Sequence, residues 1–198
     1  MNYPTYVIVN GVKYDINTDF RVALRCNQIA EDDKIGDYER LLAIIYTLYG
    51  EKGLNAYGDH EKLLEMAIKY LRCGEEPNTK PNEKKDMDFF QDEKYIKSSF
   101  KFDYNYNPYE MKYLHWWEFW NDLNNLSNSE FGSCCILNRV RQLRNYDVSK
   151  IKDPKEKADM IEAKKQVALK QPKKRMTFTE KESSKRFFEE LFKNKETR

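Results

Sequence analysis

The first sixteen residues carry the pattern of two short β-strands around a tight turn. β-Branched and aromatic residues are frequent in Thr5–Val9 and in Val12–Ile16, and such residues are typical of strands. Between them lies Asn10-Gly11, the pair favoured in a type I′ turn, in which both residues have positive φ. The chain is therefore predicted to open on a β-hairpin.

After the hairpin, the apolar spacing changes to the period of helices. Thr18 is a candidate cap for a helix over Asp19–Ala30, because its hydroxyl can accept a free backbone N–H of the first turn. A second helix is expected over Tyr38–Tyr49, and Gly50 is expected to end it. Both predictions rest on local spacing and local stop signals.

A third helix is expected to begin at Asp59 and to stop at Gly74. Residues 75–88, which follow, contain two prolines and Met87 as the one other apolar side chain. That composition predicts a linker or mobile loop. The apolar face of the third helix is expected to carry Leu63, Leu64, Ala67, Ile68 and Leu71.

Four further helices are expected beyond this loop. Asp92 begins the first of them, whose apolar residues include Ile96 and Phe100. Asn107 to Glu110 then reads as the start of a helix, with an N-cap, a proline at the first helical position and a capping-box glutamate. Ser129 begins the third, and a last amphipathic helix is expected near residues 179–193.

All three tryptophans fall within five positions, inside the segment Tyr113–Trp120. In a helix that started at Asn107, Trp116 and Trp120 would stack one turn apart and His115 would pair with Phe119. Aromatic cover on most sides is typical of a buried core helix, and the alternative is a helix shared between the core and a partner. The candidate partner-binding residues are Tyr113, His115, Trp116, Trp117, Phe119 and Trp120.

Taken together, these elements predict a mainly α fold (α+β) with one small N-terminal hairpin. The expected organisation is a hairpin plus a multi-helix domain over residues 1–150, interrupted by the mobile loop at 75–88, and a basic helical tail over 151–198. The scarcity of glycine, with 7 residues, and of proline, with 6 residues, argues against a loop-rich β-sandwich.

The net charge of +2 hides an asymmetry along the chain. Residues 150–198 hold 16 Lys and Arg against 9 Asp and Glu, a net charge of +7, whereas residues 1–149 carry −5. An acidic body with a basic tail is typical of an interaction arm, and the alternative is a solvated helical tail. Nucleic acid is a minor possibility, because the aromatic residues of the tail cluster on one helix face instead of alternating with charge.

The four cysteines, Cys26, Cys73, Cys134 and Cys135, show no CxxC spacing. With no signal-peptide pattern and no apolar run of about 20 residues, we expect free thiols and a soluble, cytoplasmic protein that does not interact with membranes.

Few residues could carry catalysis. There are two histidines, His60 and His115, and no HExxH, phosphate-binding glycine loop or Gly-x-Ser-x-Gly pattern. We therefore expect no enzyme activity, no catalytic or cofactor-binding residues, no cofactor and no metal site.

Two blocks of sequence resemble the bacteriophage "gene product fifteen" family of tailed phages and prophages of Gram-positive bacteria. One is Asp92–Phe100, with its spaced Asp, Tyr-Ile and Ser-Phe, and the other is Leu114–Phe119, which reads Leu-His-Trp-Trp-Glu-Phe. The N-terminal hairpin with its Thr-Asp-Phe-Arg helix and the Ile136, Arg139 and Arg141 helix are also similar, so the resemblance covers about residues 5–150.

The resemblance implies a non-enzymatic phage tail assembly chaperone-like protein of the host bacterial cytoplasm. Such a protein would bind the tape measure protein, keep it soluble and help to recruit the tail tube protein, with a homo-oligomer possible. The alternatives are a nucleic-acid-binding accessory protein that uses the basic tail and a structural component of the tail, which would be present in purified particles.

Overall fold

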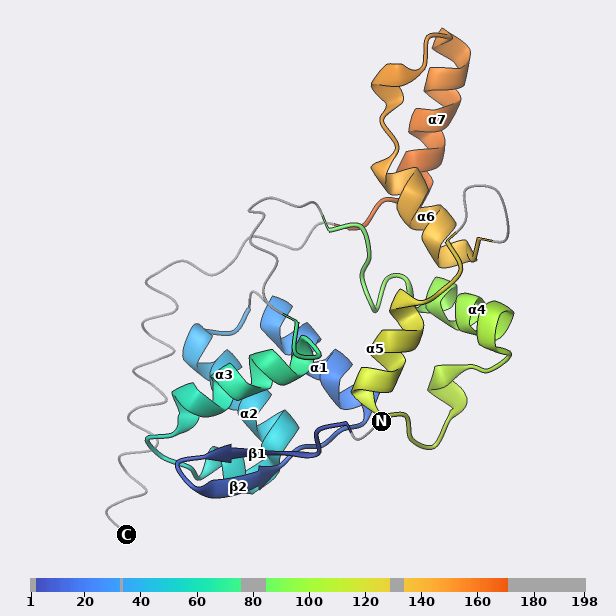
Figure 1. Cartoon of the computed structure of the whole chain (residues 1–198). Helices are drawn as coiled ribbons and strands as arrows, with labels where there is room; N and C mark the ends of the chain where they lie inside the picture. The colour runs from blue at the N-terminus through green and yellow to red at the C-terminus, as the bar shows by residue number, and fades with distance from the viewer. Residues whose placement is uncertain (1–2, 33, 76–84, 129–133, 171–198) are drawn as a thin grey trace. The chain divides into compact units, whose positions relative to one another are not determined.

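The structure is a computed structural model that describes residues 3–32, 34–75, 85–128 and 134–170 (Figure 1). These residues divide into two compact units. The first unit contains residues 3–75 and 113–117, and the second contains residues 85–112 and 118–170. Helices predominate in both units and one antiparallel hairpin belongs to the first. The predicted fold class, mainly α with a small N-terminal hairpin, is confirmed.

The hairpin consists of β1 (Tyr6–Val9) and β2 (Val12–Asp15), which pair with Val9 opposite Val12. Asn10 has φ +49° and Gly11 has φ +80°, as a two-residue type I′ turn requires. Val9 and Tyr14 are buried, whereas Ile8 is exposed, so the sheet has one covered and one open face.

The rest of the first unit is built on three helices, α1 (Phe20–Glu31), α2 (Asp37–Leu54) and α3 (His60–Leu71). α1 packs on α2, and α2 packs on α3 and on β2. The buried side chains at the centre of these helices include Phe20, Leu24, Ile45, Leu48, Leu63 and Ala67.

The ends of these helices differ from the sequence prediction. Asp19, not Thr18, caps α1, because its carboxylate accepts the N–H of Arg21 at 2.9 Å. The Thr18 hydroxyl instead lies 2.7 Å from the Tyr113 hydroxyl. Gly50 interrupts the helix as predicted, with a non-helical φ of +67° and ψ of −158°, but a further helical segment continues beyond this kink to Leu54.

The buried stripe of α3 also differs from the predicted one. Leu63, Ala67 and Tyr70 are buried, while Ile68 is 42% exposed. Positions i, i+4 and i+7 lie on one line along a helix, so the stripe centred on Ala67 excludes Ile68. The prediction of Ile68 on the apolar face was wrong, because it assigned all the aliphatic residues of the helix to a single broad face.

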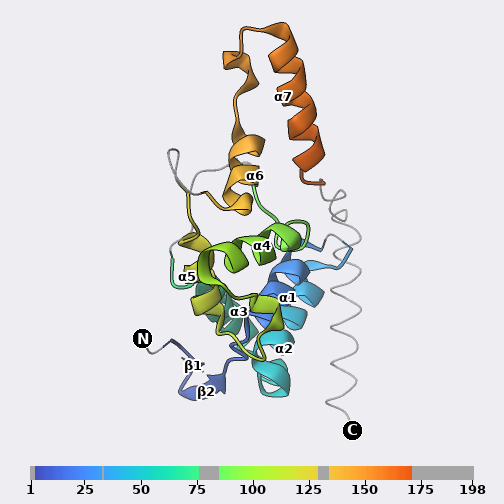
Figure 2. The ribbon, with the colours of Figure 1, turned by 90° about the vertical axis from the view of Figure 1, so that its right-hand side faces the viewer.

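The second unit contains α4 (Glu93–Tyr104), the 3₁₀ turn η1 (Pro108–Glu110), α6 (Ile136–Asn145), the 3₁₀ turn η2 (Val148–Lys150) and α7 (Pro154–Val167). α4 packs on η1 and α6, and α6 packs on α7. Figures 1 and 2 both show α6 and α7 side by side. The core side chains include Ile96, Phe100, Phe119, Leu137 and Val140.

The tryptophan helix does not start at Asn107. Asn107 does make the expected contacts, since it accepts the N–H of Tyr109 and donates to Glu110, but they hold only the single turn η1. Met111 is extended, with φ −70° and ψ 142°, and α5 (Trp116–Asn124) begins five residues later. The boundary between the two units falls within α5, after Trp117.

Other predicted elements are partly outside the described residues. α6 begins at Ile136 after an extended Cys135, and the predicted start at Ser129 lies outside the described residues, as does the predicted helix at 179–193. Of the predicted loop at 75–88, residues 75 and 85–88 are described. α7 lies in the predicted tail, and Asp153 caps it by accepting the N–H of Glu156.

Candidate functional site

The six aromatic residues singled out in the sequence fall into different environments. Trp116, Phe119 and His115 are buried, so they cannot contact a partner without rearrangement. Trp117 and Trp120 are half-buried and Tyr113 is exposed. The structure therefore separates core aromatics from surface aromatics within one short segment.

Two indole groups bind the end of α3. Trp116 Nε1 donates to the carbonyl of Leu71 at 3.0 Å, and Trp117 Nε1 donates to the carbonyl of Tyr70 at 3.0 Å. The last carbonyls of a helix have no partner within the helix, and the Trp116 indole supplies one to Leu71. The Tyr70 carbonyl also accepts the backbone N–H of Cys73 at 2.9 Å, so the Trp117 indole is a second donor to it. Both tryptophans are thereby held in fixed orientations within the first unit.

His115 sits immediately before α5 and acts as its cap. Its Nδ1 accepts the N–H of Trp117 at 3.0 Å, and its Nε2 lies 3.4 Å from the carbonyl oxygen of Pro4. The ring stacks on Tyr3 with centroids 4.8 Å apart. α5 therefore begins after His115, whereas the prediction placed His115 inside the helix.

Phe119 belongs to the core of the second unit. Its ring stacks on Phe100 with centroids 5.4 Å apart and an interplanar angle of 12°. The next aromatic residue, Trp120, lies 6.3 Å from the Phe89 ring. Consecutive positions on a helix point about 100° apart, so Phe119 faces the core while Trp120 faces its edge.

Trp120 lies at a depression of about 560 Å³ in the second unit. Met87, Trp120 and Leu123 supply its apolar lining. Asp86 and Arg141 form an ion pair at its polar rim, with Arg141 Nε 3.2 Å from the Asp86 carboxylate. We refer to this feature as the Trp120 depression, and it offers apolar surface beside polar groups that could orient a ligand.

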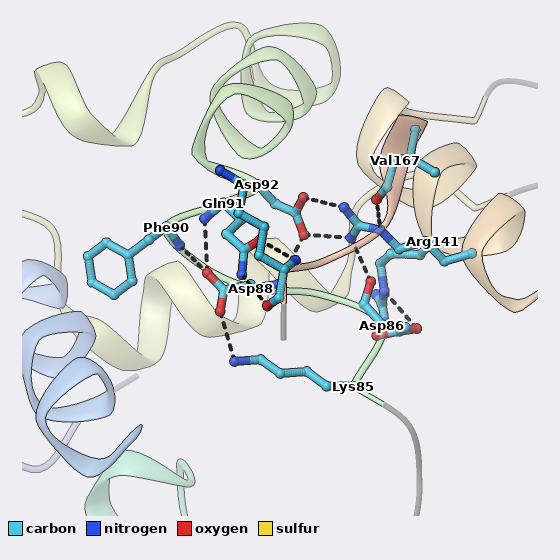
Figure 3. A network of polar contacts seen from close by, with 10 residues as sticks. Lys85, Asp86, Asp88, Phe90, Gln91, Asp92, Arg141 and Val167 are labelled. Atoms are coloured by element: carbon cyan, nitrogen blue, oxygen red, sulfur yellow. Dashed lines mark hydrogen bonds and ion pairs between the residues drawn. The ribbon is translucent and has the colours of Figure 1, made fainter. Parts of the chain in front are cut away.

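A buried ion pair stabilises the segment that forms the rim. Arg144 donates from Nη1 and Nη2 to the two oxygens of Asp92, each at 2.7 Å. Arg144 also donates to the carbonyl of Asp86 at 2.7 Å and to the carbonyl of Val167 at 2.6 Å. Figure 3 shows Asp86, Asp92 and Val167 within this network. One guanidinium therefore joins residues 86–92, α6 and the end of α7.

Asp88 holds the turn before α4. Its carboxylate accepts the backbone N–H groups of Phe90 and Gln91, both at 2.9 Å, and pairs with Lys85 (Figure 3). Burial by itself would raise the pKa of this carboxyl. The hydrogen bonds from Gln91 and Lys85 outweigh burial and lower the pKa below its ordinary value.

Sequence reasoning missed the most buried polar residue of this region. Asp92 was predicted to begin a helix, and it does stand at the N-cap position of α4. Its side chain, however, makes no cap bond and is fully buried against Arg144. The sequence offers an acidic residue ahead of an amphipathic helix as a signal, but the partner of Asp92 lies 52 residues away.

Metal-binding groups do not assemble in the described part of the chain. His60 Nε2 lies 2.9 Å from the carbonyl oxygen of Leu54, which places it at the end of α2 and not beside His115. Within residues 3–32, 34–75, 85–128 and 134–170, no three His, Cys, Asp or Glu side chains gather in a way that could hold a metal ion. Among the described helices, none has the length and apolar character needed to cross a membrane.

The sequence matches the family model described as Bacteriophage Gp15 protein over residues 3–169. This chain belongs to the bacteriophage Gp15 family. The resemblance seen in the Asp92–Phe100 and Leu114–Phe119 blocks is thus confirmed, and the protein is a phage protein. No curated protein and no solved structure matches the chain.

The Gp15 match includes every residue of the Trp120 depression and of the Arg144 network. It ends at residue 169, so residues 170–198, which contain much of the basic charge of the tail, lie outside it. The family region is therefore the two described units, and the candidate site lies within it.

Proposed function

We propose that this Gp15 family protein is a non-enzymatic tail assembly chaperone-like protein. In this proposal it works in the host bacterial cytoplasm, binds the phage tape measure protein and helps tail tube subunits to assemble around it. Membership of the phage family supports the general role. The half-buried Trp120, which lies beside polar groups in the Trp120 depression, is the observation that favours partner binding.

The Trp120 depression has the chemistry of a peptide-binding surface. Trp120, Met87 and Leu123 line it, next to the Asp86–Arg141 pair. Tryptophan is enriched among the residues that dominate binding free energy, and methionine adapts its shape to different apolar partners. An apolar stripe of an amphipathic helix could lie in such a depression while its polar residues meet the rim.

A long helical partner suits repeated binding. A tape measure chain that offers many similar helical stripes could bind several copies of this protein, and the linkage of the sites would raise the overall affinity without new contacts. Moderate affinity at each site would also allow tail tube subunits to displace the bound copies during assembly.

The test is co-expression of the full-length protein with the tape measure protein of the same phage, followed by affinity capture and light scattering. The proposal predicts a soluble complex with several copies of this chain for each tape measure chain. A tape measure protein that stays insoluble and captures nothing would refute the function. Detection of the chain in purified particles would instead favour a structural tail component.

Matched variants test the site separately from the function. Trp120→Ala should remain folded and reduce capture, because Trp120 is half-buried at the depression. Phe102→Ala is the control, since Phe102 is 64% exposed in the same unit and does not line the depression. If Trp120→Ala is folded and captures as well as Phe102→Ala, the depression is not the binding surface, whatever the function.

A further inference from the structure

α7 carries apolar residues that the described residues leave incompletely covered. None of its 14 residues is buried, although it includes Met160, Ile161 and Val167. Ile161 is 38% exposed. Isolated helices of about this length are marginal in water, so contacts on its apolar side, from α6 and η2 or from another molecule, stabilise it.

A pocket of about 290 Å³ lies on this side of α7. Val148, Ile161, Ala168 and Leu169 supply its apolar walls. Ile161, Lys164, Lys165 and Ala168 follow the i, i+3, i+4, i+7 spacing of one helix face. The volume lies just below the range of about 300–1,000 Å³ for ligand pockets, which suits one or two inserted side chains. We call it the α6–α7 pocket.

The lining of the α6–α7 pocket contains cations and no carboxylate among the described residues. Its charged members are Lys85, Arg144, Lys164 and Lys165. Arg144 is neutralised by the buried Asp92, and Lys85 pairs with Asp88.

Of the described charged residues that line the pocket, Lys164 and Lys165 of α7 are the two that are not paired closely with a carboxylate. Lys164 donates to the carbonyl of Tyr146, which neutralises no charge. The Lys165 side chain is 71% exposed, and its nearest carboxylate, Glu162, lies 3.8 Å away. An exposed pair of this kind contributes little free energy, so both ammonium groups can engage an anionic ligand.

We propose that the α6–α7 pocket binds an amphipathic helix of a partner protein that presents carboxylates beside its apolar residues. An apolar side chain of that helix enters between Val148, Ile161 and Leu169, and its flanking carboxylates meet Lys164 and Lys165. A phosphate backbone would satisfy the lysines but would leave the apolar walls in contact with water. An apolar helix without acids would leave the lysines beside it unpaired.

The α6–α7 pocket shares Lys85 and Asn145 with the Trp120 depression, but Ile161, Lys164 and Lys165 line the α6–α7 pocket and not the depression. The inference therefore does not require the tape measure protein to be the partner. Its ligand class follows from the charge and shape of the α6–α7 pocket alone. The two surfaces can therefore be tested independently in the same full-length protein.

The experiment uses the full-length protein and a fluorescent synthetic helix with leucine at every third or fourth position and glutamate beside each leucine. Anisotropy should report saturable binding that weakens with salt. Lys164→Glu combined with Lys165→Glu should weaken it by about tenfold or more, because like charges then face each other. Ile161→Ser should also weaken it, although it changes no charge.

Lys155→Glu combined with Lys157→Glu is the matched control, because it makes the same charge change on the same helix away from the pocket. Binding should then stay within about twofold, and circular dichroism should show that all variants are folded. Two results would overturn the proposal, because each would show that binding depends on net charge alone. One is that a scrambled peptide of the same composition binds as tightly as the designed helix. The other is that the control variant loses as much affinity as the Lys164 and Lys165 variant.

Two further outcomes would assign the pocket to another occupant. If duplex DNA displaces the peptide from the wild-type protein, and this effect of DNA is lost in the Lys164 and Lys165 variant, the α6–α7 pocket is a nucleic-acid site. Self-association of the protein that disappears in the same variant, without peptide binding, would make it a contact between copies of this chain. Absence of any binding by the wild-type protein would also refute the inference.

Discussion

Arg144 and Asp92 form a two-point ion pair in which each carboxylate oxygen accepts a different guanidinium nitrogen at 2.7 Å. The Asp92 side chain is 1% exposed and the Arg144 side chain is 9% exposed. Parallel hydrogen bonds of this kind set the orientation of both groups as well as their distance. The pair therefore determines where the end of α6 meets the start of α4.

Arg144→Met should lower the free energy of unfolding by about 3–5 kcal/mol, because it leaves the Asp92 charge buried without a partner. Urea denaturation followed by circular dichroism measures this change. Arg141→Met is the control. Its ion pair with Asp86 is partly exposed on both sides, so its loss should cost no more than about 1 kcal/mol. Equal losses in the two variants would contradict the central role of Arg144.

His115→Phe should destabilise the first unit by about 0.5–2 kcal/mol, the usual effect of losing a helix cap. The phenyl ring can keep the stack on Tyr3 but cannot accept the Trp117 N–H. His115→Asn restores a side-chain acceptor and should recover part of the loss in thermal denaturation. A His115→Phe protein as stable as the wild type would show that the Nδ1 contact contributes nothing.

Cys26 should make the protein less stable in alkali. Burial raises the pKa of this thiol to about 12, whereas an exposed thiol titrates near a pKa of about 8.5. The stabilisation that the buried, protonated Cys26 thiol contributes is fully present below the unfolded-state pKa. It is lost as pH rises toward 12, because the thiol ionises at a lower pH in the unfolded chain than in the folded protein. Cys26→Ala should reduce the slope of unfolding free energy by up to about 1.4 kcal/mol per pH unit above pH 9.

Thiol labelling provides a second measurement on the same residue. At pH 8 the native protein should leave Cys26 unmodified by a maleimide, and denaturant should expose it, with mass spectrometry of peptides as the readout. Rapid labelling of Cys26 in the native protein would contradict its burial.

Asp88 should make the protein less stable in acid. Its pKa is lowered because the hydrogen bonds from Gln91 and Lys85 outweigh the effect of burial. The stabilisation is therefore present above the unfolded-state pKa of about 3.9 and is lost as pH falls through the lower folded-state pKa. Asp88→Asn should flatten the acid limb of a pH titration of stability. An unchanged acid limb would show that Asp88 does not contribute to it.

Prediction from sequence succeeded where the signal was local. The type I′ turn at Asn10-Gly11 depends on two residues, and the pair predicted it correctly. Prediction from sequence was less successful where two adjacent residues could both cap a helix. Both Thr18 and Asp19 are capable of this. Asp19 caps α1, because the Thr18 hydroxyl contacts the hydroxyl of Tyr113.

The tryptophan segment shows the limit of periodicity. A helix from Asn107 would have placed His115 and Phe119 together, but the chain is extended at Met111 and α5 starts at Trp116. Trp116 is buried because its indole reaches the carbonyl of Leu71, 45 residues away in sequence. No spacing within the segment contains that information.

The sequence by itself determined the mainly α class, the hairpin and most helices, because turns, caps and helical periodicity depend on residues two to seven positions apart. It also indicated the phage family, through the resemblance of the Asp92–Phe100 and Leu114–Phe119 blocks. Only the tertiary structure decided which aromatics are buried and that the Asp92 side chain pairs with Arg144. Those outcomes depend on partners brought together by folding, and the stability of a buried charge or ring is set by the groups that surround it in space.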